Sequence, residues 1–231
     1  MPKPLLAAAI GLAAAICMSE AAFAQASDQP TYVVTYIEVA PKAVAETRGL
    51  ITTHCTNAHK AAGLIEMDAL QRLGRTNHFA ILEKWQSAKA RDDYAATDTT
   101  KSFIAGLGPV LIAGYDERLH VPLTVAASEA PLSGAVVALT HVDLIPTFKD
   151  PGVAKVKEFA EASRGSDGNL RFDVLTQANR ANHMTVVESW SNAAARDAHI
   201  SSSLARTFRQ SLMPMSGSLY DEREYSVVHC G

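Results

Sequence analysis

The sequence has no run of lysine or arginine and no basic cluster. Its 21 lysines and arginines are balanced by 24 aspartates and glutamates, which gives a formal net charge of −3. Nucleic-acid-binding domains usually carry a basic stripe, so nucleic acid is not expected as a partner. Beyond the first two dozen residues there is also no apolar stretch approaching the roughly 20 residues that cross a bilayer. We therefore expect no membrane span in the mature protein.

Residues 1–24 have the pattern of a cleavable signal peptide. Lys3 supplies a positive charge, an apolar run follows, and Ala22–Ala24 place small residues before a cleavage site at Gln25. The apolar run stops at Ser19, which makes it too short for a transmembrane helix. The sequence therefore predicts a periplasmic or secreted protein.

Cysteine is scarce, with Cys17 in the predicted signal peptide and only Cys55 and Cys230 after it. In an oxidising compartment the last two could form a disulfide that ties the C-terminus to the first half of the chain. A buried, reduced Cys55 with a free Cys230 is the alternative. The spacing leaves both open.

One motif occurs twice. The stretch EKWQSAKARDD at 83–93 returns as ESWSNAAARDA at 188–198, an offset of 105 residues (188 − 83). At this offset the match runs without a gap from Thr35/Thr140 to Arg118/Arg223, through identical pairs that include Pro41/Pro146, Gly63/Gly168, Asn77/Asn182, His78/His183 and Tyr115/Tyr220. A constant offset of this length indicates a duplication. We divide the chain into repeat 1 (31–122), a small, polar, proline-bearing linker (123–134) and repeat 2 (135–229).

Each repeat predicts the same order of elements. A β-branched, apolar strand (TYVVTYIEV or AVVALTHVDL) is followed by a helix that ends at Gly63 or Gly168. Two strands joined by a short turn then form a hairpin, and Ser87 or Asn192 caps a second helical region. A last strand completes the repeat. The order β-α-β-β-α-β is that of a ferredoxin-like fold.

Two such repeats predict an α+β fold in which both halves form one intramolecular dimeric barrel. A single sheet with helices on one face would leave its other face apolar and wet, whereas two sheets packed face to face bury both. Strands at the edges can pair across the junction. The linker makes this pseudo-dimer internal and holds its halves at high effective concentration. Association into a further homo-oligomer stays open.

This layout resembles the antibiotic biosynthesis monooxygenase (ABM) superfamily of dimeric α+β barrels. The resemblance rests on Glu-x-Trp at the end of the third strand, on the capped helix with Ala-Arg-Asp, and on a downstream Phe and Pro in both repeats. The superfamily includes cofactor-independent quinol monooxygenases, haem-degrading enzymes and members without an assigned activity. It implies a pocket between sheet and helices, where a deprotonated phenolic substrate reduces O2 directly without a cofactor.

Two histidines of repeat 2 are the predicted catalytic residues. Members of the superfamily often carry a histidine on the helix that lines the pocket, and His199 occupies that place, where repeat 1 has Tyr94. His141 on the first strand, where repeat 1 has Tyr36, could supply a second group that titrates near neutral pH. The two pockets are therefore expected to be unequal, with the chemistry in repeat 2.

The predicted substrate-binding residues are Trp190, Trp85, Tyr94, His183, Asn182 and Arg196. Most have a structural alternative. Each tryptophan shares a strand face with the glutamate two residues before it and could equally fill the core. Arg196 and Arg91 are close enough in sequence to form ion pairs with Glu188 and Glu83. His183 begins a strand and could be solvated there. Asn182 could simply form the preceding turn.

A soft-metal site can be drawn from Cys55 and His59, which lie at i,i+4 on one helix, with His54 beside them. Repeat 2 has Ala160 and Arg164 at the matching positions, so the cluster is not part of the shared pattern. No metal is predicted. The arrangement of Asn, Trp and His that haem-degrading members use cannot be placed on either repeat.

The sequence thus predicts a periplasmic, cofactor-independent monooxygenase that acts on a quinol or another phenolic compound with O2. Two alternatives stay open. The first is a non-catalytic module that binds an aromatic, lipid or haem-like ligand, and it is favoured by the lack of a clear acid–base pair. The second is a structural protein whose pockets have collapsed. Fold analogy by itself does not decide between them.

Overall fold

The computed structural model describes residues 29–126, 132 and 136–228, so the predicted signal peptide and Cys230 lie outside the described residues. Repeat 1 contains β1 (Thr31–Glu38), η1 (Pro41–Ala43), α2 (Val44–Ala58), β2 (Leu64–Arg72), β3 (His78–Trp85), α3 (Ala88–Ala95), α4 (Asp98–Leu107) and β4 (Asp116–Thr124). Repeat 2 contains β5 (Val136–Asp143), η2 (Pro146–Phe148), α5 (Lys149–Ser163), β6 (Asn169–Gln177), β7 (His183–Trp190), α6 (Ala193–Ile200), α7 (Ser203–Leu212), η3 (Met213–Met215) and β8 (Asp221–Val228).

The predicted order β-α-β-β-α-β is confirmed in both repeats, with the second helical region divided into two helices. Gly63 and Gly168 follow the first helix of each repeat with φ of 82° and 76°, a conformation that glycine adopts without strain. Ser87 and Asn192 cap α3 and α6, because each side chain accepts a hydrogen bond from the backbone amide three residues later.

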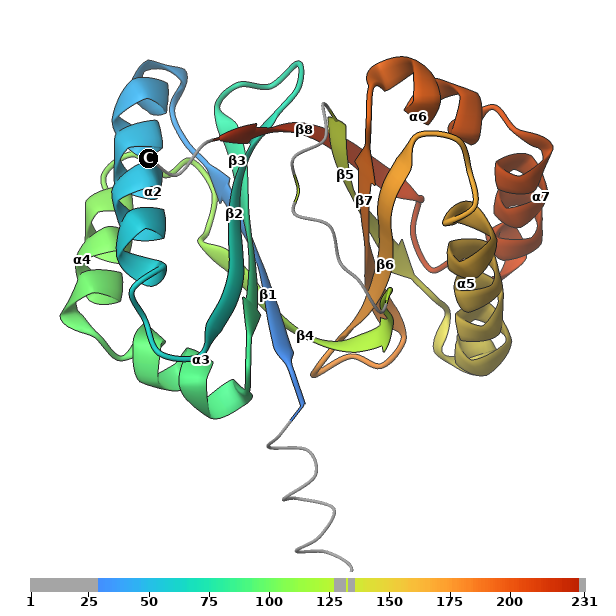
Figure 1. The fold of residues 1–231 in the computed structure, drawn as a ribbon, viewed down its shortest axis with the longest axis horizontal. Helices are drawn as coiled ribbons and strands as arrows, with labels where there is room; N and C mark the ends of the chain where they lie inside the picture. The colour runs from blue at the N-terminus through green and yellow to red at the C-terminus, as the bar shows by residue number, and fades with distance from the viewer. Residues whose placement is uncertain (1–28, 127–131, 133–135, 229–231) are drawn as a thin grey trace, which may run out of the picture.

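The eight strands form a closed barrel in the order β1-β3-β2-β8-β5-β7-β6-β4. The last strand of each repeat pairs antiparallel with the other repeat, β8 with β2 and β4 with β6. Figure 1 shows β8 and β4 crossing between the two halves in this way. The predicted edge pairing is therefore confirmed, and closure leaves no free sheet edge.

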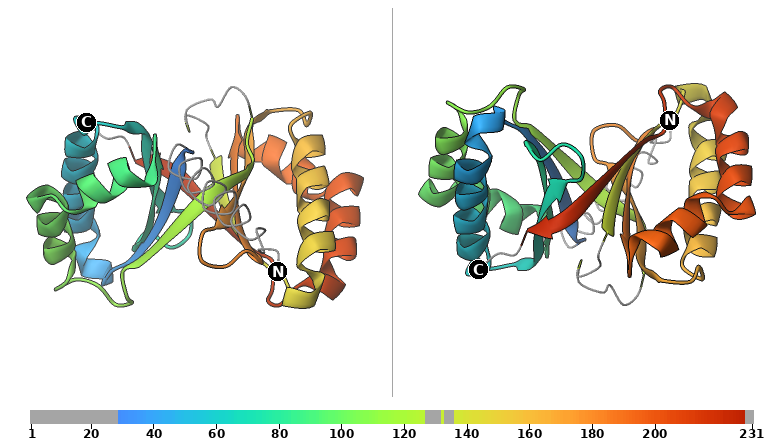
Figure 2. Two further views of the ribbon diagram at one scale, coloured as in Figure 1. Left: turned by 90° about the horizontal axis from the view of Figure 1, so that it is seen from below. Right: turned by 90° about the horizontal axis from the view of Figure 1, so that it is seen from above.

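Helices cover the outer face of the barrel on two opposite sides, as Figure 2 shows. Side chains alternate along each strand, so Phe79 and Ile81 of β3 pack under the helices of repeat 1, whereas Ala80 and Leu82 point into the barrel. Repeat 2 has its own core between sheet and helices. The two sheets thus bury both of their faces, as the duplication predicts.

Two further observations bear on the predictions. β4 continues to Thr124, so the segment assigned to the linker begins inside a strand. No helix within residues 29–126 and 136–228 is long and apolar enough to cross a membrane.

Candidate functional site

The two predicted catalytic histidines lie on opposite faces of the repeat 2 sheet. His199 is on α6 and packs on Trp190, which faces the helices, with 4.7 Å between ring centroids. His141 on β5 faces the barrel interior, where its Nε2 lies 3.3 Å from Nδ1 of His183. Strand alternation separates these two faces. The structure therefore does not bring His199 and His141 together in one pocket.

A hydrogen bond joins the glutamate and tryptophan of each repeated motif. Nε1 of the fully buried Trp190 donates to Oε2 of Glu188 over 3.0 Å, and Trp85 donates to Glu83 over 2.7 Å. Burial raises the pKa of Glu188 to about 7, although Arg196 and the indole bond oppose the rise. Burial also raises the pKa of Glu83. Burial beneath the helices therefore favours the neutral form of each carboxyl relative to a solvated glutamate.

His199 is enclosed by aromatic rings and is only 5% exposed. Phe159 and Phe172 lie 5.6 and 5.9 Å from its ring, centroid to centroid. Its Nδ1 lies 3.1 Å from Oγ of Ser166, while Nε2 is buried without a hydrogen-bond partner. Burial, followed by the nearby positive charges of two arginines, lowers the pKa of His199 to about 4. The imidazole is therefore neutral at physiological pH and carries one unused ring nitrogen.

The expected ion pairs between the motif arginines and glutamates are not formed. Arg196 is buried and pairs with Glu224 and Glu222 of β8, at N–O distances of 2.6 and 3.3 Å. Arg91 pairs with Glu117 of β4 and with its neighbour Asp92. In both repeats the arginine thus ties the capped helix to the last strand of its own repeat. That contact depends on tertiary packing and has no signal in the motif spacing.

Repeat 1 contains the same cluster with one exchange. Tyr94 packs on Trp85 at 5.2 Å, in the place where His199 packs on Trp190. A histidine is present here too, on α2: His54 lies 5.7 Å from Tyr94 and stacks on Phe103 at 4.1 Å, all between ring centroids. His54 was not among the predicted substrate or catalytic residues. The offset of 105 aligns His54 with Phe159. This difference between the repeats is the sequence feature that could have pointed to His54.

His183 and Asn182 lie away from the helix-side cluster. Nε2 of His183 is 3.3 Å from Oδ1 of Asp143, so this histidine belongs to a polar group inside the barrel. Asn182 donates from Nδ2 to the carbonyl oxygen of Leu144 over 2.7 Å, and Asn77 makes the same bond in repeat 1. The asparagine thus braces the turn before the hairpin's second strand, which agrees with its structural alternative.

The barrel interior also holds a buried ionic group that the sequence patterns did not indicate. Arg171 of β6 donates to Asp173 on its own strand over 2.6 Å and to both carboxylate oxygens of Glu66 on β2, over 2.8 and 3.0 Å. The contact with Glu66 joins repeat 2 to repeat 1. Burial and the nearby Glu66 raise the pKa of Asp68 to about 7. This group thus links the two sheets across the barrel interior.

The cavities are unequal, and the larger of two equivalent grooves lies in repeat 1. A groove of about 640 Å³ between α2 and α4 is lined in part by His54 and Phe103. The equivalent groove between α5 and α7 measures about 160 Å³ and has Phe159 and Phe208 at those positions. A third hollow, of about 620 Å³, lies beside the segment between α7 and β8. None of these three is lined by Trp190 or His199.

No group of three or more histidine, cysteine, aspartate or glutamate side chains within the described part of the chain could hold a metal ion. Cys55 is disulfide-bonded, which removes its thiolate from the cluster considered above. His59 bonds through Nδ1 with the backbone oxygen of Cys55 at 2.8 Å. The His–Cys–His neighbourhood on α2 is therefore not arranged as a soft-metal site.

A family profile described as antibiotic biosynthesis monooxygenase matches residues 30–106 and again residues 136–211. A predicted monooxygenase from Fusobacterium nucleatum subsp. nucleatum superposes with a TM-score of 0.76 at 13% identity, over 87% of this chain and 93% of that one. A second predicted monooxygenase, from Lactobacillus acidophilus, superposes with a TM-score of 0.69 at 14% identity, over 87% of this chain and 95% of that one. An anthrone oxidase-like protein superposes with a TM-score of 0.70 at 12% identity, over 88% of this chain and 93% of that one. These three show a shared fold. No curated protein matches the chain.

Proposed function

The chain belongs to the antibiotic biosynthesis monooxygenase family, and on this premise we propose that it is a cofactor-independent monooxygenase of a hydroquinone or another phenolic compound. In the proposed reaction a hydroquinone and O2 give a hydroxyquinone and water. One oxygen atom enters the ring and the other leaves as water. The substrate supplies all four electrons that reduce O2, so the reaction needs no external reductant.

The observation that carries this proposal is the neutral imidazole of His199 in a water-poor aromatic cluster. When Nδ1–H donates to Ser166, Nε2 holds a free lone pair. That lone pair suits the hydroxyl of a phenol whose ring lies against Trp190. Such a contact orients the substrate and provides a place for its proton.

The low basicity of His199 is compatible with this role. A phenol that has given up an electron is a far stronger acid than the neutral phenol. The proton can therefore move to Nε2 as the electron leaves for O2, even though the pKa of His199 is about 4. The aromatic surroundings exclude water, which would otherwise compete for the same nitrogen.

Oxygen uptake tests the proposed function. Mature protein is incubated with a panel of hydroquinones, and O2 consumption is followed beside a protein-free control. We expect protein-dependent uptake that is strongly reduced in His199→Ala. The absence of protein-dependent uptake across the panel would count against the proposal.

A non-catalytic binding module is the second candidate function. It is favoured by the burial of His199 away from the three cavities above, because a closed site without a ready entrance suits retention better than turnover. Native mass spectrometry of the purified protein separates the two candidates. A stoichiometric small ligand on a protein that consumes no O2 would assign the binding function.

Export to an oxidising compartment is part of the proposal. It is supported by the signal-peptide pattern of residues 1–24 and by the disulfide-bonded state of Cys55. Expression in a Gram-negative host followed by fractionation and N-terminal sequencing tests it. We expect a periplasmic product that starts at Gln25, and an uncleaved cytoplasmic product would contradict this.

A further inference from the structure

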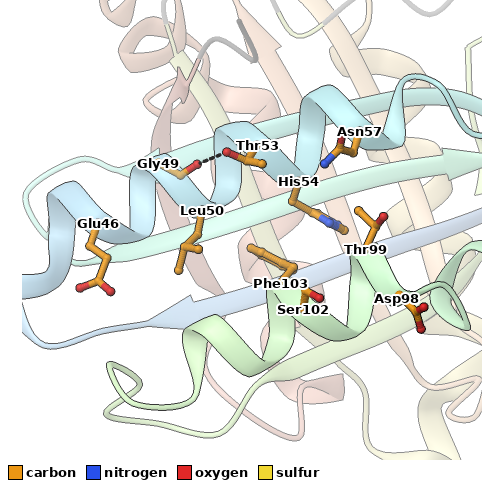
Figure 3. Close-up of a pocket in the computed structure, with 10 residues that line it drawn as sticks. All are labelled: Glu46, Gly49, Leu50, Thr53, His54, Asn57, Asp98, Thr99, Ser102 and Phe103. Carbon is orange, nitrogen blue, oxygen red and sulfur yellow. Dashed lines mark hydrogen bonds between the residues drawn. The ribbon is translucent and has the colours of Figure 1, made fainter.

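A groove of about 640 Å³ lies between α2 and α4 of repeat 1. Figure 3 shows side chains from both helices around it, with His54 on α2 and Phe103 on α4 next to each other. We infer that this groove binds a neutral hydroxylated aromatic ring, with the imidazole of His54 as the acceptor for the ring's hydroxyl. The inference goes beyond the proposed function, because it assigns a second ring-binding site, in repeat 1, and it rests on that function only for the identity of the ring as a substrate.

His54 supplies the acceptor. The residue is only 4% exposed, and its Nδ1 is buried without a hydrogen-bond partner. Burial lowers the pKa of His54 to about 4, so the ring is neutral at physiological pH. A neutral imidazole has one acceptor nitrogen, and a buried polar atom without a partner is costly to the fold. A half-turn of the ring about its Cβ–Cγ bond would exchange its two edges and place Nδ1 where Cδ2 now lies.

The other groove residues fit a flat ring with polar substituents. Phe103 stacks on His54 with an interplanar angle of 7°, and Leu50 adds an apolar side chain. Asn57 and Ser102 contribute amide and hydroxyl groups that can both donate and accept, and Thr53, whose hydroxyl donates to the Gly49 carbonyl over 2.9 Å, offers an acceptor. A cavity of this volume is large enough for a small aromatic ligand.

Charge selects against anions. The groove is lined by Glu46 and Asp98, and none of its ten lining residues is a lysine or an arginine. A carboxylate or phosphate ligand would meet no cation among the lining residues, and the nearby Lys101 is paired with Asp98 at 3.7 Å. A phenolic hydroxyl, which is neutral and donates, suits both the acidic rim and the imidazole acceptor.

Repeat 2 shows that the fold does not require these features. At the equivalent groove Phe159 replaces His54 and Leu204 replaces Thr99, and the volume falls to about 160 Å³. Phe159 stacks on Phe208 with 3.9 Å between the ring centroids and 1° between the ring planes. A phenylalanine therefore packs at this position at least as well as a histidine. The unpartnered Nδ1 of His54 therefore has no packing explanation, and a ligand supplies one.

A second cavity lies between the groove and the Glu–Trp cluster of repeat 1. A neighbouring cavity of about 320 Å³ is lined by Asn57 and Thr99, which line the main groove as well, and by Tyr94. Tyr94 packs on Trp85 at 5.2 Å. The neighbouring cavity thus lies between the groove and Tyr94, which covers the buried tryptophan.

Anaerobic titration of the full mature chain tests the inference. The probe is 2-naphthol, with 2-naphthoate as its anionic counterpart, and binding is followed through amide chemical shifts. We expect 2-naphthol to shift amides of α2 and α4, and 2-naphthoate to bind far more weakly. His54→Phe, which installs the residue of repeat 2, should weaken binding about tenfold through the lost hydrogen bond. Thr99→Leu should abolish it by filling the groove.

The duplication provides matched controls. Leu204→Thr and Phe159→His make the reverse changes in repeat 2 and should leave binding in repeat 1 unchanged. Thermal unfolding of each variant verifies the fold. If His54→Phe does not fold, the inference is still tested by Thr99→Leu and by the comparison of 2-naphthol with 2-naphthoate. Shifts confined to α5 and α7, equal binding of both probes, or unchanged affinity in both repeat 1 variants would overturn the inference.

Failure of this inference and failure of the proposed function are distinguishable, because binding is measured without oxygen. Naphthol binding in the groove without O2 uptake from any hydroquinone would leave the inference standing and remove the oxidase chemistry. O2 uptake that depends on His199, together with no 2-naphthol binding in the groove, would do the reverse.

Discussion

The imidazole of His54 lies 5.7 Å from the ring of Tyr94, with 39° between the ring planes. The equivalent residues of repeat 2, Phe159 and His199, lie 5.6 Å apart at 31°. Both repeats therefore keep one imidazole and one carbocyclic ring at the same contact, with the two positions exchanged. The packing is nearly constant, while the imidazole is on α2 in repeat 1 and on α6 in repeat 2. Each repeat thus serves as a reference for the other.

His199→Ala should lower the rate of protein-dependent O2 uptake by about a hundredfold, because a positioned proton acceptor typically contributes at least that much. His78→Ala is a suitable control, since His78 pairs with Glu38 at 3.3 Å at the start of β3, on the strand face opposite Trp85. The measurement is kcat/KM in an oxygen electrode. Equal losses in both variants would indicate a general effect on folding.

His54→Phe should raise stability at pH 7 by about 1 kcal/mol, because it removes a buried nitrogen without a partner. The pKa of His54 is about 4 in the folded protein, against 6.5 as its ordinary value. The unfolded chain therefore binds the extra proton first, and the wild type loses stability as the pH falls from about 6.5 towards about 4. The advantage of the variant should grow over this window in urea titrations. A difference that does not change with pH would argue that His54 is solvated.

Glu188→Gln should show the opposite pH dependence. Burial raises the pKa of Glu188 from 4.5 to about 7, so the folded protein holds a proton that the unfolded chain has released. The wild type therefore loses stability as the pH rises through this window, by at most about 3 kcal/mol. Glutamine keeps an acceptor for the Trp190 indole and does not titrate. Relative to the wild type, the variant should be more stable at pH 8 than at pH 5, as measured by chemical denaturation.

Arg171→Met should destabilise the barrel by about 3–5 kcal/mol, because it leaves Glu66 and Asp173 without their shared cation. Lys89→Met is the matched control. It breaks the exposed pair with Asp93 and should cost less than about 1 kcal/mol. Equal unfolding midpoints for the two variants would show that the barrel group contributes little to holding the repeats together.

Cys55→Ser should lower stability by about 4–5 kcal/mol, since the disulfide of Cys55 closes a long loop in the unfolded chain. Cys17 lies in the predicted signal peptide, so Cys230 is the expected partner in the mature protein. Peptide mapping without reductant should recover the two cysteines in one linked fragment. Recovery of both as alkylated thiols from freshly isolated periplasm would refute the pairing.

Much of the site could be predicted from local patterns. Period-two alternation places Glu188 and Trp190 on one strand face, and the structure adds that they are joined by a hydrogen bond. The same rule places His141 on the other face, because β5 and β7 pair in a register that sets Val136 opposite Trp190. The sequence prediction combined His141 with His199 without that register. Pairing between strands was the missing information.

Other contacts carry no sequence signal. Arg196 lies eight residues after Glu188, yet its partners are Glu222 and Glu224 on β8. His54 was read beside Cys55 and His59 because these are neighbours on one helix, whereas its ring meets Phe103 of α4. Helix spacing indicates which residues share a face but not what that face will contact.

The sequence by itself determined the duplication, the order of elements in each half and the need to cover two apolar sheet faces, because these follow from periodicity, turn residues and a constant offset of 105. Tertiary structure alone decided that β8 and β4 are the strands that pair with the other half, that Arg171 reaches Glu66, and that the larger groove lies beside His54. The reason is physical. Local patterns fix which side of an element is apolar, whereas barrel closure and helix packing fix which residues, distant along the chain, finally meet.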